Sequence, residues 1–414
     1  MRQRSELHNL LNIAVSVAQY YGFRPMDDVV AMHVPPAHEV ENRSVDERKQ
    51  ARNGYHMRQR HVFSDASIFD LCIQGSIVLP LPAPILTYAF SSRSHAALSP
   101  YQASGGLTFE VLGAQGSVAE ALLMHAMHAA VVEAGLRGTM VMNSVGDRVA
   151  FAKFRTDCMN YYRRRYRDLH APCREAFTNH LEKIFECQND HCIAIRENAP
   201  RTMDYLNESS RRHLKEVLEY LELLHIPYYI DDQMVAAADP ESNVETVFAL
   251  YVEYGKDETA SPRNDGDDSR SLFSGAPLIY GGRREKKSLN GRERVHEAYA
   301  TIAVNTPRAR GHFREEPQKE KCKAHFVQFG PEARRKNFFV LETLRRMHIP
   351  VSYSLVEVKL GEALRHAEER SIPFTIIMGQ KEAMSDSVIV RRTETRAQET
   401  VSLSLLPAYL KHAR

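Results

Sequence analysis

The stretch that decides the fold is Phe109-Glu110-Val111-Leu112-Gly113-Ala114-Gln115-Gly116-Ser117-Val118-Ala119-Glu120-Ala121. Its first four residues are typical of a short β-strand, and Gly113 ends that strand. Residues 118–134 are rich in Ala, Leu and Met, which favours an α-helix, and Gly135 ends it. The sequence therefore predicts a strand that leads directly into a long apolar helix.

The composition indicates a globular protein. A length of 414 residues allows two or three domains, and 43% hydrophobic with 26% charged residues is usual for such proteins. The formal net charge of +2 neither demands nor excludes a nucleic-acid partner, because binding depends on local patches. No apolar run reaches the about 18 residues of a membrane span, and the first residues lack the apolar core of a signal peptide. We expect a cytoplasmic protein without membrane contact.

Six cysteines are scattered over the chain, and free buried thiols are their expected state. A zinc cluster could be drawn from the residues between 158 and 192, namely Cys158, His170, Cys173, Cys187, His191 and Cys192. The cysteines of this group do not show the tight Cys-x2-Cys spacing of a zinc knuckle. The sequence therefore predicts no metal site.

Helix and strand patterns alternate through the first two thirds of the chain. An amphipathic helix is predicted over residues 6–22, with Gly22 at its C-terminal cap. Three prolines separate the β-type runs 77–79 and 85–88 and exclude a central strand between them. Further predictions are a strand at 139–142 ending in a turn at 143–146, helical residues 151–190, a helix at 212–224, and strands at 226–230 and 246–252. Polar segments at 43–60, 254–272 and 306–322 predict loops or linkers, the second of them mobile.

The C-terminal part alternates strand and helix patterns more regularly. Strands are predicted at 325–329, 351–355, 374–378 and 387–391, and helices at 331–347, 359–370 and 404–410. This alternation is typical of a compact α/β domain of about 90 residues.

Several segments, in order along the chain, resemble class II histidyl-tRNA synthetases. They are the stretch 109–121 itself, Tyr21-Gly22-Phe23, Asn143-Ser144-Val145-Gly146, the approach 205–231 to the histidine-binding strand, and C-terminal residues that include Gly379, Glu382 and Gln398. The Pro of the family's motif 1 is not found where it would fall, near Val29. The resemblance implies an α/β fold whose core, residues 1–320, is a class II antiparallel sheet with flanking helices. It places a helical insertion at about 151–200 and the mobile loop at about 254–272, followed by an anticodon-binding-like α/β domain over 323–414. It also implies a homodimer.

The positions that carry the family's chemistry depart from its pattern. The Phe-Arg-x-Glu motif grips the ATP α-phosphate, and here the matching stretch is Phe90-Ser91-Ser92-Arg93. Ser91 replaces the arginine, and a hydroxyl cannot supply the fixed charge that the transition state needs. Arg93 is a candidate replacement, but an offset of two residues along a strand moves it by about 7 Å.

The other motifs are altered as well. In the histidine-binding signature, Met234-Val235-Ala236-Ala237-Ala238-Asp239-Pro240-Glu241 keeps only Asp239. A later strand keeps Gly281-Gly282-Arg283. Arg310 is the best match for the arginine of motif 3, although a solvated basic face formed by Arg308 and Arg310 is the favoured explanation. The resemblance thus implies that residual ATP or substrate binding would fall on Glu110, Asp239, Gly281, Gly282 and Arg283, with Arg93 and Arg310 as candidate catalytic cations.

Three functions follow from this pattern. The first is a degenerate synthetase-like protein that binds tRNA, another RNA or a protein partner instead of aminoacylating. The second is a divergent, active histidine–tRNA ligase, which alone would use ATP and Mg²⁺. The third is a regulatory partner of ATP phosphoribosyltransferase, against which the retained C-terminal domain counts. Candidate RNA-binding residues are Arg163, Arg164, Arg165 and Arg167, which alternate with tyrosines, and Gln398. A solvated helix face is the alternative explanation of those arginines.

Overall fold

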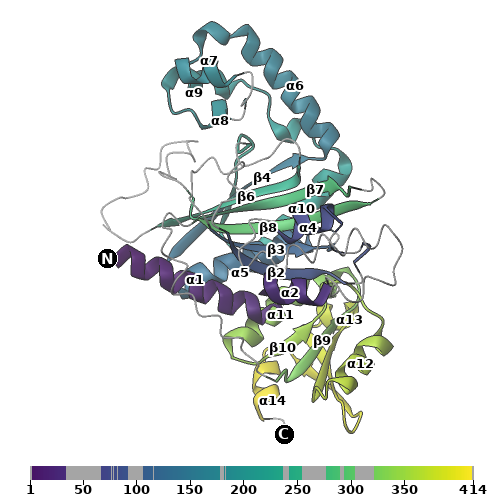
Figure 1. Cartoon of the computed structure of the whole chain (residues 1–414). Coiled ribbons are helices and arrows are strands. Elements are labelled where there is room, and N and C mark those ends of the chain that lie inside the picture. Colours follow the sequence, from purple (N-terminus) through teal and green to yellow (C-terminus); the bar gives the residue numbers. More distant parts are fainter. Residues whose placement is uncertain are drawn as a thin grey trace.

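Two β-sheets and a helical insertion form the part of the protein that the structure describes (Figure 1). The computed structural model describes residues 2–33, 67–91, 106–177, 181–235, 242–253, 277–289, 293–303 and 321–412, apart from residues 76, 78, 82, 115 and 182. Among these residues, no helix has both the length and the apolar character needed to cross a membrane. The insertion projects from one end of the large sheet, and the smaller sheet lies at the opposite end (Figure 1).

The large sheet has eight strands in the order β1-β2-β3-β8-β7-β6-β4-β5. Their bounds are Arg24–Pro25 (β1), Ile85–Ser91 (β2), Gly106–Leu112 (β3), Arg137–Gly146 (β4), Tyr228–Ile230 (β5), Asn243–Glu253 (β6), Ile279–Lys287 (β7) and Arg294–Ala303 (β8). The six inner strands pair antiparallel, whereas the short edge strands β1 and β5 pair parallel to their neighbours. The expected antiparallel core sheet with flanking helices is confirmed.

Three helices cover one face of this sheet, which we call the α5 face. They are α1 (Arg2–Tyr20), α5 (Val118–Glu133) and α10 (Glu208–Leu223). The central helix α5 is buried on almost every side, because it packs against α1 and α10 as well as against the sheet. This explains why its sequence is apolar all round. Phe109 and Val111 of β3 point into this core.

The opposite face, called the α4 face, carries two separate covers. Near β2, β3 and β8 lie α2 (Met26–His33) and α4 (Ile68–Ile73), which enclose Leu112 and Val295. A capping box between Ser67 and Asp70 begins α4. Near β4 and β6 lies the insertion, formed by α6 (Arg148–Arg164), η2 (Tyr166–Asp168), α7 (Ala171–Ala176), α8 (Lys183–Glu186), α9 (Asp190–Glu197) and η3 (Thr202–Tyr205).

The smaller sheet has five strands in the order β10-β9-β11-β12-β13. They are β9 (Ala324–Gln328), β10 (Val351–Tyr353), β11 (Phe374–Met378), β12 (Ser387–Arg392) and β13 (Gln398–Ser402), with helices α11 (Pro331–Arg346), α12 (Leu360–Glu369), α13 (Gln380–Met384) and α14 (Leu406–His412). This C-terminal unit contacts the core through a buried polar group: the Tyr21 hydroxyl donates to Glu342 Oε2 at 2.9 Å and lies 2.7 Å from His125 Nε2. The division of the chain at residues 320 and 323 stays a prediction.

Some sequence expectations were wrong in detail. Ile77 and Leu79, expected in a strand, lie in bends instead. The predicted turn at 143–146 is the last part of β4, and a bulge at its end lets the strand continue. Buried Asn143 is tolerated there because its amide donates to Met234 O and accepts from the Thr202 hydroxyl. After Phe23, the edge strand β1 has two residues and passes directly into α2. The segments 43–60, 254–272 and 306–320 lie outside the described residues.

Candidate functional site

The α4 face of the large sheet carries a polar strip across β3, β8, β7 and β6. Residues paired across antiparallel strands share a face, and Glu110 pairs with Tyr299, which also pairs with Gly282. Thr108 continues the strip, since its Oγ1 lies 3.0 Å from Oγ1 of Thr301. From β6, the Asn243 amide donates to the Tyr299 hydroxyl at 3.4 Å.

Sequence reasoning missed most of this strip, although a signal was present. The strand β8 carries Glu297, Tyr299 and Thr301 at alternate positions, and β3 carries Thr108 and Glu110 in the same way. Polar residues with a period of two inside otherwise apolar strands indicate one polar sheet face.

One guanidinium and two carboxylates form the buried centre of the strip. Arg284 Nε donates to Glu297 Oε2 at 2.8 Å, and Arg284 Nη2 lies 3.8 Å from Glu110 Oε1. The guanidinium also lies over two rings, 4.4 Å from the centroid of Tyr299 and 4.9 Å from that of Phe69. Glu110 Oε2 accepts the backbone N–H of Ile68 at 3.2 Å, which joins α4 to the site. We call Glu110, Arg284 and Glu297 the α4-face cluster.

The α4-face cluster holds more carboxylates than cations. Burial raises the pKa of Glu297 well above its ordinary value, and the neighbouring Glu110 carboxyl raises it further, which outweighs the lowering by Arg284. The protonated form of the Glu297 carboxyl is therefore favoured. Such a cluster is neutralised internally and has no free positive charge for an anionic ligand.

Arg283, predicted from the sequence to act together with Glu110, lies on the α5 face instead. Its Nη1 donates to Gly116 O at 2.6 Å and lies 3.3 Å from both carboxylate oxygens of Glu120. His213 Nε2 lies 2.8 Å from Glu120 Oε1 on the other side. Since successive strand residues alternate faces, Arg283 and Arg284 point in opposite directions. We call Arg283, Glu120 and His213 the α5-face cluster.

The charges of the α5-face cluster are balanced differently. Burial alone would raise the pKa of Glu120, but Arg283 and His213 lower it to about 2. Burial likewise opposes the charged form of His213, yet the Glu120 carboxylate raises the pKa of this histidine above its ordinary value. Glu120 is thus an ionised carboxylate held between two cationic groups.

The two predicted ligand-binding glycines have a packing role. A Cβ atom on Gly281 would lie 2.2 Å from Tyr299 O and 2.5 Å from Phe248 Cζ. A Cβ atom on Gly282 would lie 2.6 Å from Thr246 O. The close approach of β6 and β8 to β7 therefore accounts for both glycines without a ligand.

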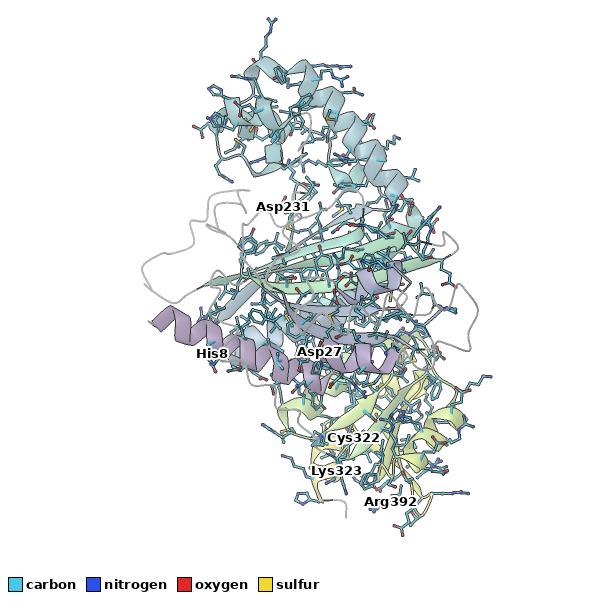
Figure 2. The ribbon with its side chains drawn as sticks, in the orientation of Figure 1. His8, Asp27, Asp231, Cys322, Lys323 and Arg392 are labelled. Carbon is cyan, nitrogen blue, oxygen red and sulfur yellow. The ribbon has the colours of Figure 1, made fainter. Side chains whose placement is uncertain are left out.

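The remaining predicted residues are distributed over the molecule. Arg93, Asp239 and Arg310 lie outside the described residues. Ser91 ends β2 and pairs with Gly106. Asp231, labelled in Figure 2, lies between the large sheet and the insertion, and its backbone N–H donates to Met142 O at 3.0 Å.

The RNA-binding candidates lie on two separate surfaces. Arg163, Arg164 and Arg167 are exposed at the end of α6 and in η2, and the Arg165 guanidinium lies 4.0 Å from the ring centroid of Tyr161. Gln398 is exposed on β13, the edge strand of the smaller sheet.

Two cavities lie away from the polar strip. One, of about 420 Å³, lies where the end of α1 meets the C-terminal unit and is lined by Tyr20, Tyr353 and His366 among others. The other, of about 600 Å³, is lined by charged residues of α10 and α11 such as Glu219 and Arg335.

This sheet with its flanking helices, followed by the smaller α/β unit, defines a class II aminoacyl-tRNA synthetase-like protein. Residues 332–413 match the family described as an anticodon binding domain. Histidine–tRNA ligase of Listeria innocua is 25% identical over 266 residues, 64% of this chain and 59% of the relative. That of Thermotoga maritima is 24% identical over 311 residues, 73% of this chain and 68% of the relative. By sequence, the chain is therefore similar to class II histidyl-tRNA synthetases over about two thirds of its length.

Among solved structures, the apo histidyl-tRNA synthetase of S. aureus is similar to this chain. It is 18% identical, with a TM-score of 0.42, and the comparison covers 99% of this chain and 97% of that chain. The chain spans 59% of the length of the Listeria relative.

Proposed function

We propose that this protein acts by binding RNA, and tRNA in particular, rather than by activating histidine. The proposal rests on the burial of the two adjacent arginines of β7 and on their pairing with carboxylates. Arg283 and Arg284 are both buried, and each is paired with carboxylates of this chain. Ser91 stands at the motif 2 position, where the resemblance requires a third arginine.

The polar strip does not fit the phosphates of ATP. An ATP phosphate would bring negative charge next to Glu110 and Glu297, and it would have to displace Glu297 from Arg284 to gain a cation. Leaving a buried polar group without its hydrogen-bond partner typically costs about 1–3 kcal/mol. We therefore propose no ATP or Mg²⁺ cofactor for this chain.

Two features support RNA as the partner. The match of residues 332–413 to an anticodon binding domain supports tRNA as the RNA that is bound. The exposed arginines at the end of α6 offer a second positive surface, and guanidinium groups pair well with phosphates. A homodimer, implied by the family resemblance, belongs to the same proposal.

A gel-shift titration of the full chain with histidine tRNA at low and moderate salt tests the proposal. We expect a complex at low salt that weakens as salt rises, because bound phosphates release counterions. Replacing three exposed arginines by Gln should lower the slope of log K against log salt by about one for each phosphate that the variant no longer binds. The variants are Arg163→Gln, Arg164→Gln and Arg167→Gln. The matched control replaces the exposed arginines Arg137, Arg211 and Arg212 by Gln.

The outcomes distinguish two RNA-binding surfaces from the absence of RNA binding. A shift that the control variant retains and the α6 variant loses supports RNA binding through the insertion. A shift that both retain places the RNA on the C-terminal unit. No shift at low salt contradicts RNA binding, and calorimetric titration with ATP and histidine then tests the competing proposal of a divergent histidine–tRNA ligase.

A further inference from the structure

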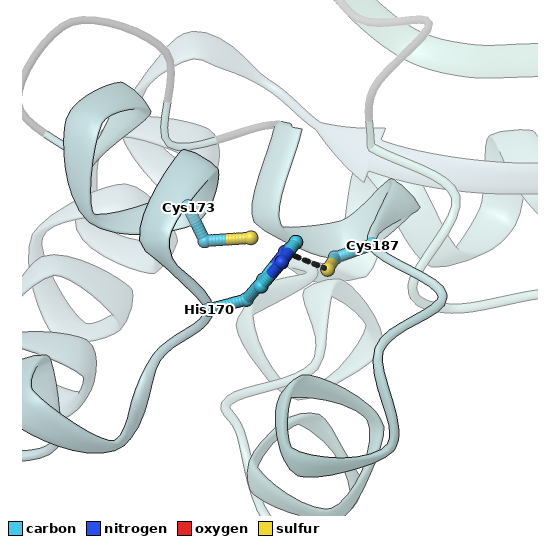
Figure 3. Close-up of side chains that lie close together, drawn as sticks. All are labelled: His170, Cys173 and Cys187. Carbon is cyan, nitrogen blue, oxygen red and sulfur yellow. Dashed lines mark hydrogen bonds between the residues drawn. The ribbon is translucent and has the colours of Figure 1, made fainter.

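The insertion brings together an imidazole and three thiols that the sequence separates. Nδ1 or Nε2 of His170 and the Sγ atoms of Cys173 and Cys187 all lie within 4.8 Å of one another. Figure 3 shows the three side chains converging on a common point, with His170 Nδ1 3.9 Å from Cys187 Sγ. A fourth thiol is adjacent to one of them: Cys192 Sγ lies 3.8 Å from Cys173 Sγ, although it is not within 4.8 Å of all three ligand atoms.

The distances suit a tetrahedral metal ion. Zinc–sulfur bonds of about 2.3 Å at tetrahedral angles place two sulfurs about 3.8 Å apart. The separation of Cys173 and Cys192 has this value, and the separation of His170 from Cys187 is close to it. Cys192 Sγ also accepts the backbone N–H of His170 at 3.3 Å, a type of contact that stabilises a metal-bound thiolate.

The spacing along the chain also suits zinc once histidine is counted as a ligand. His170 and Cys173 are separated by two residues, and Cys187 and Cys192 by four (188–191). Both values fall in the range usual for the ligand pairs of structural zinc sites. The first pair, His170 and Cys173, does not have the form Cys-x2-Cys, so that pattern does not reveal the site.

We propose that His170, Cys173, Cys187 and Cys192 bind one structural Zn²⁺ ion. The site joins the start of α7, the segment after α8 and the first turn of α9. Three thiolates and one imidazole as ligands favour zinc over the oxygen-seeking cations Mg²⁺ and Ca²⁺. Four protein ligands leave no open position, so the ion stabilises the insertion and takes part in no reaction.

A bound metal ion would stabilise the short helices of the insertion. The helices α7 and α8 have six and four residues, which is too short to be stable without tertiary support. Cys173 and Cys192 lie in the small core that these helices share with α6. Since a structural site forms only in the folded state, its binding free energy stabilises that state.

Metal analysis of the full-length chain tests the site. The chain is produced in zinc-supplemented medium, freed of loosely bound metal, and analysed by mass spectrometry for zinc per chain. Zinc is then removed and replaced by Co²⁺, whose visible spectrum reports tetrahedral geometry and thiolate ligands. The variant is Cys173→Ser with Cys187→Ser. The matched control is Cys322→Ser, a half-exposed cysteine outside the insertion.

We expect about one zinc per chain in the wild type and in the control, and intense tetrahedral cobalt bands with sulfur-to-cobalt charge transfer in both. The double variant should lose the zinc and these bands. If the double variant does not fold, the cobalt spectrum of the wild type decides the question. A zinc-free wild type without a tetrahedral cobalt spectrum overturns the proposal. So does a double variant with undiminished zinc, or a disulfide between Cys173 and Cys192 in the purified chain.

Discussion

On the α5 face of the large sheet two cationic groups share one carboxylate, Glu120, whereas on the α4 face two carboxylates share one guanidinium, Arg284. The two arginines involved are neighbours in sequence, and the alternation of a strand sends them to opposite faces. A retained Gly-Gly-Arg motif therefore does not by itself imply a retained ligand site. Each arginine is held by the chain's own carboxylates, and the protonation of those carboxylates differs between the faces.

The largest effect is expected from removing the charge of Glu120. Glu120→Gln leaves Arg283 buried without an ionised partner, which should lower the free energy of unfolding at pH 7 by about 3–5 kcal/mol. The matched change on the other face is Glu297→Gln, which resembles the protonated carboxyl and should cost at most about 1 kcal/mol. Urea denaturation of both variants measures the difference. Equal losses for the two variants would contradict the opposite protonation of the two clusters.

A smaller effect is expected from the glycines of β7. Gly281→Ala places a methyl group against the backbone oxygen of Tyr299, so we expect a loss of about 1–3 kcal/mol in the free energy of unfolding. Gly282→Ala, with a less severe contact to Thr246 O, should cost less. The measurement is again urea denaturation. If both variants were as stable as the wild type, the packing explanation would fail and a ligand-binding role would regain support.

The smallest effect concerns pH and the α5-face cluster. The pKa of His213 is higher in the folded state than in the unfolded state, where it is about 6.5. The protonated imidazole therefore contributes fully to the free energy of unfolding below the unfolded pKa, and this contribution is lost as pH rises through the folded pKa. His213→Gln should lower the free energy of unfolding by about 1 kcal/mol at pH 6 and by progressively less at higher pH. Thermal unfolding at several pH values measures this difference. A constant difference between pH 6 and pH 9 would show that His213 is not protonated in the fold.

The sequence predicted the sheet and helices well where the hydrophobic pattern is long. The helix after Ser117 was predicted to end at residue 134, and it ends at Glu133. Short elements depend on local signals: α4 begins with the capping box of Ser67 and Asp70, which a search for long periodic segments passes over. Contacts between segments that are distant in the sequence were even harder to predict. Nothing in the local sequence pairs Arg284 with Glu297 or places Cys192 beside Cys173, since the folded chain creates both neighbourhoods.

Histidine-dependent exchange of pyrophosphate into ATP by the full chain tests the central claim most directly, with an active histidine–tRNA ligase as positive control. The internal pairing of Arg283 and Arg284, together with Ser91 at the motif 2 position, predicts exchange at the level of a protein-free blank. Exchange well above that blank, dependent on added histidine, would contradict the account and identify the protein as an active ligase.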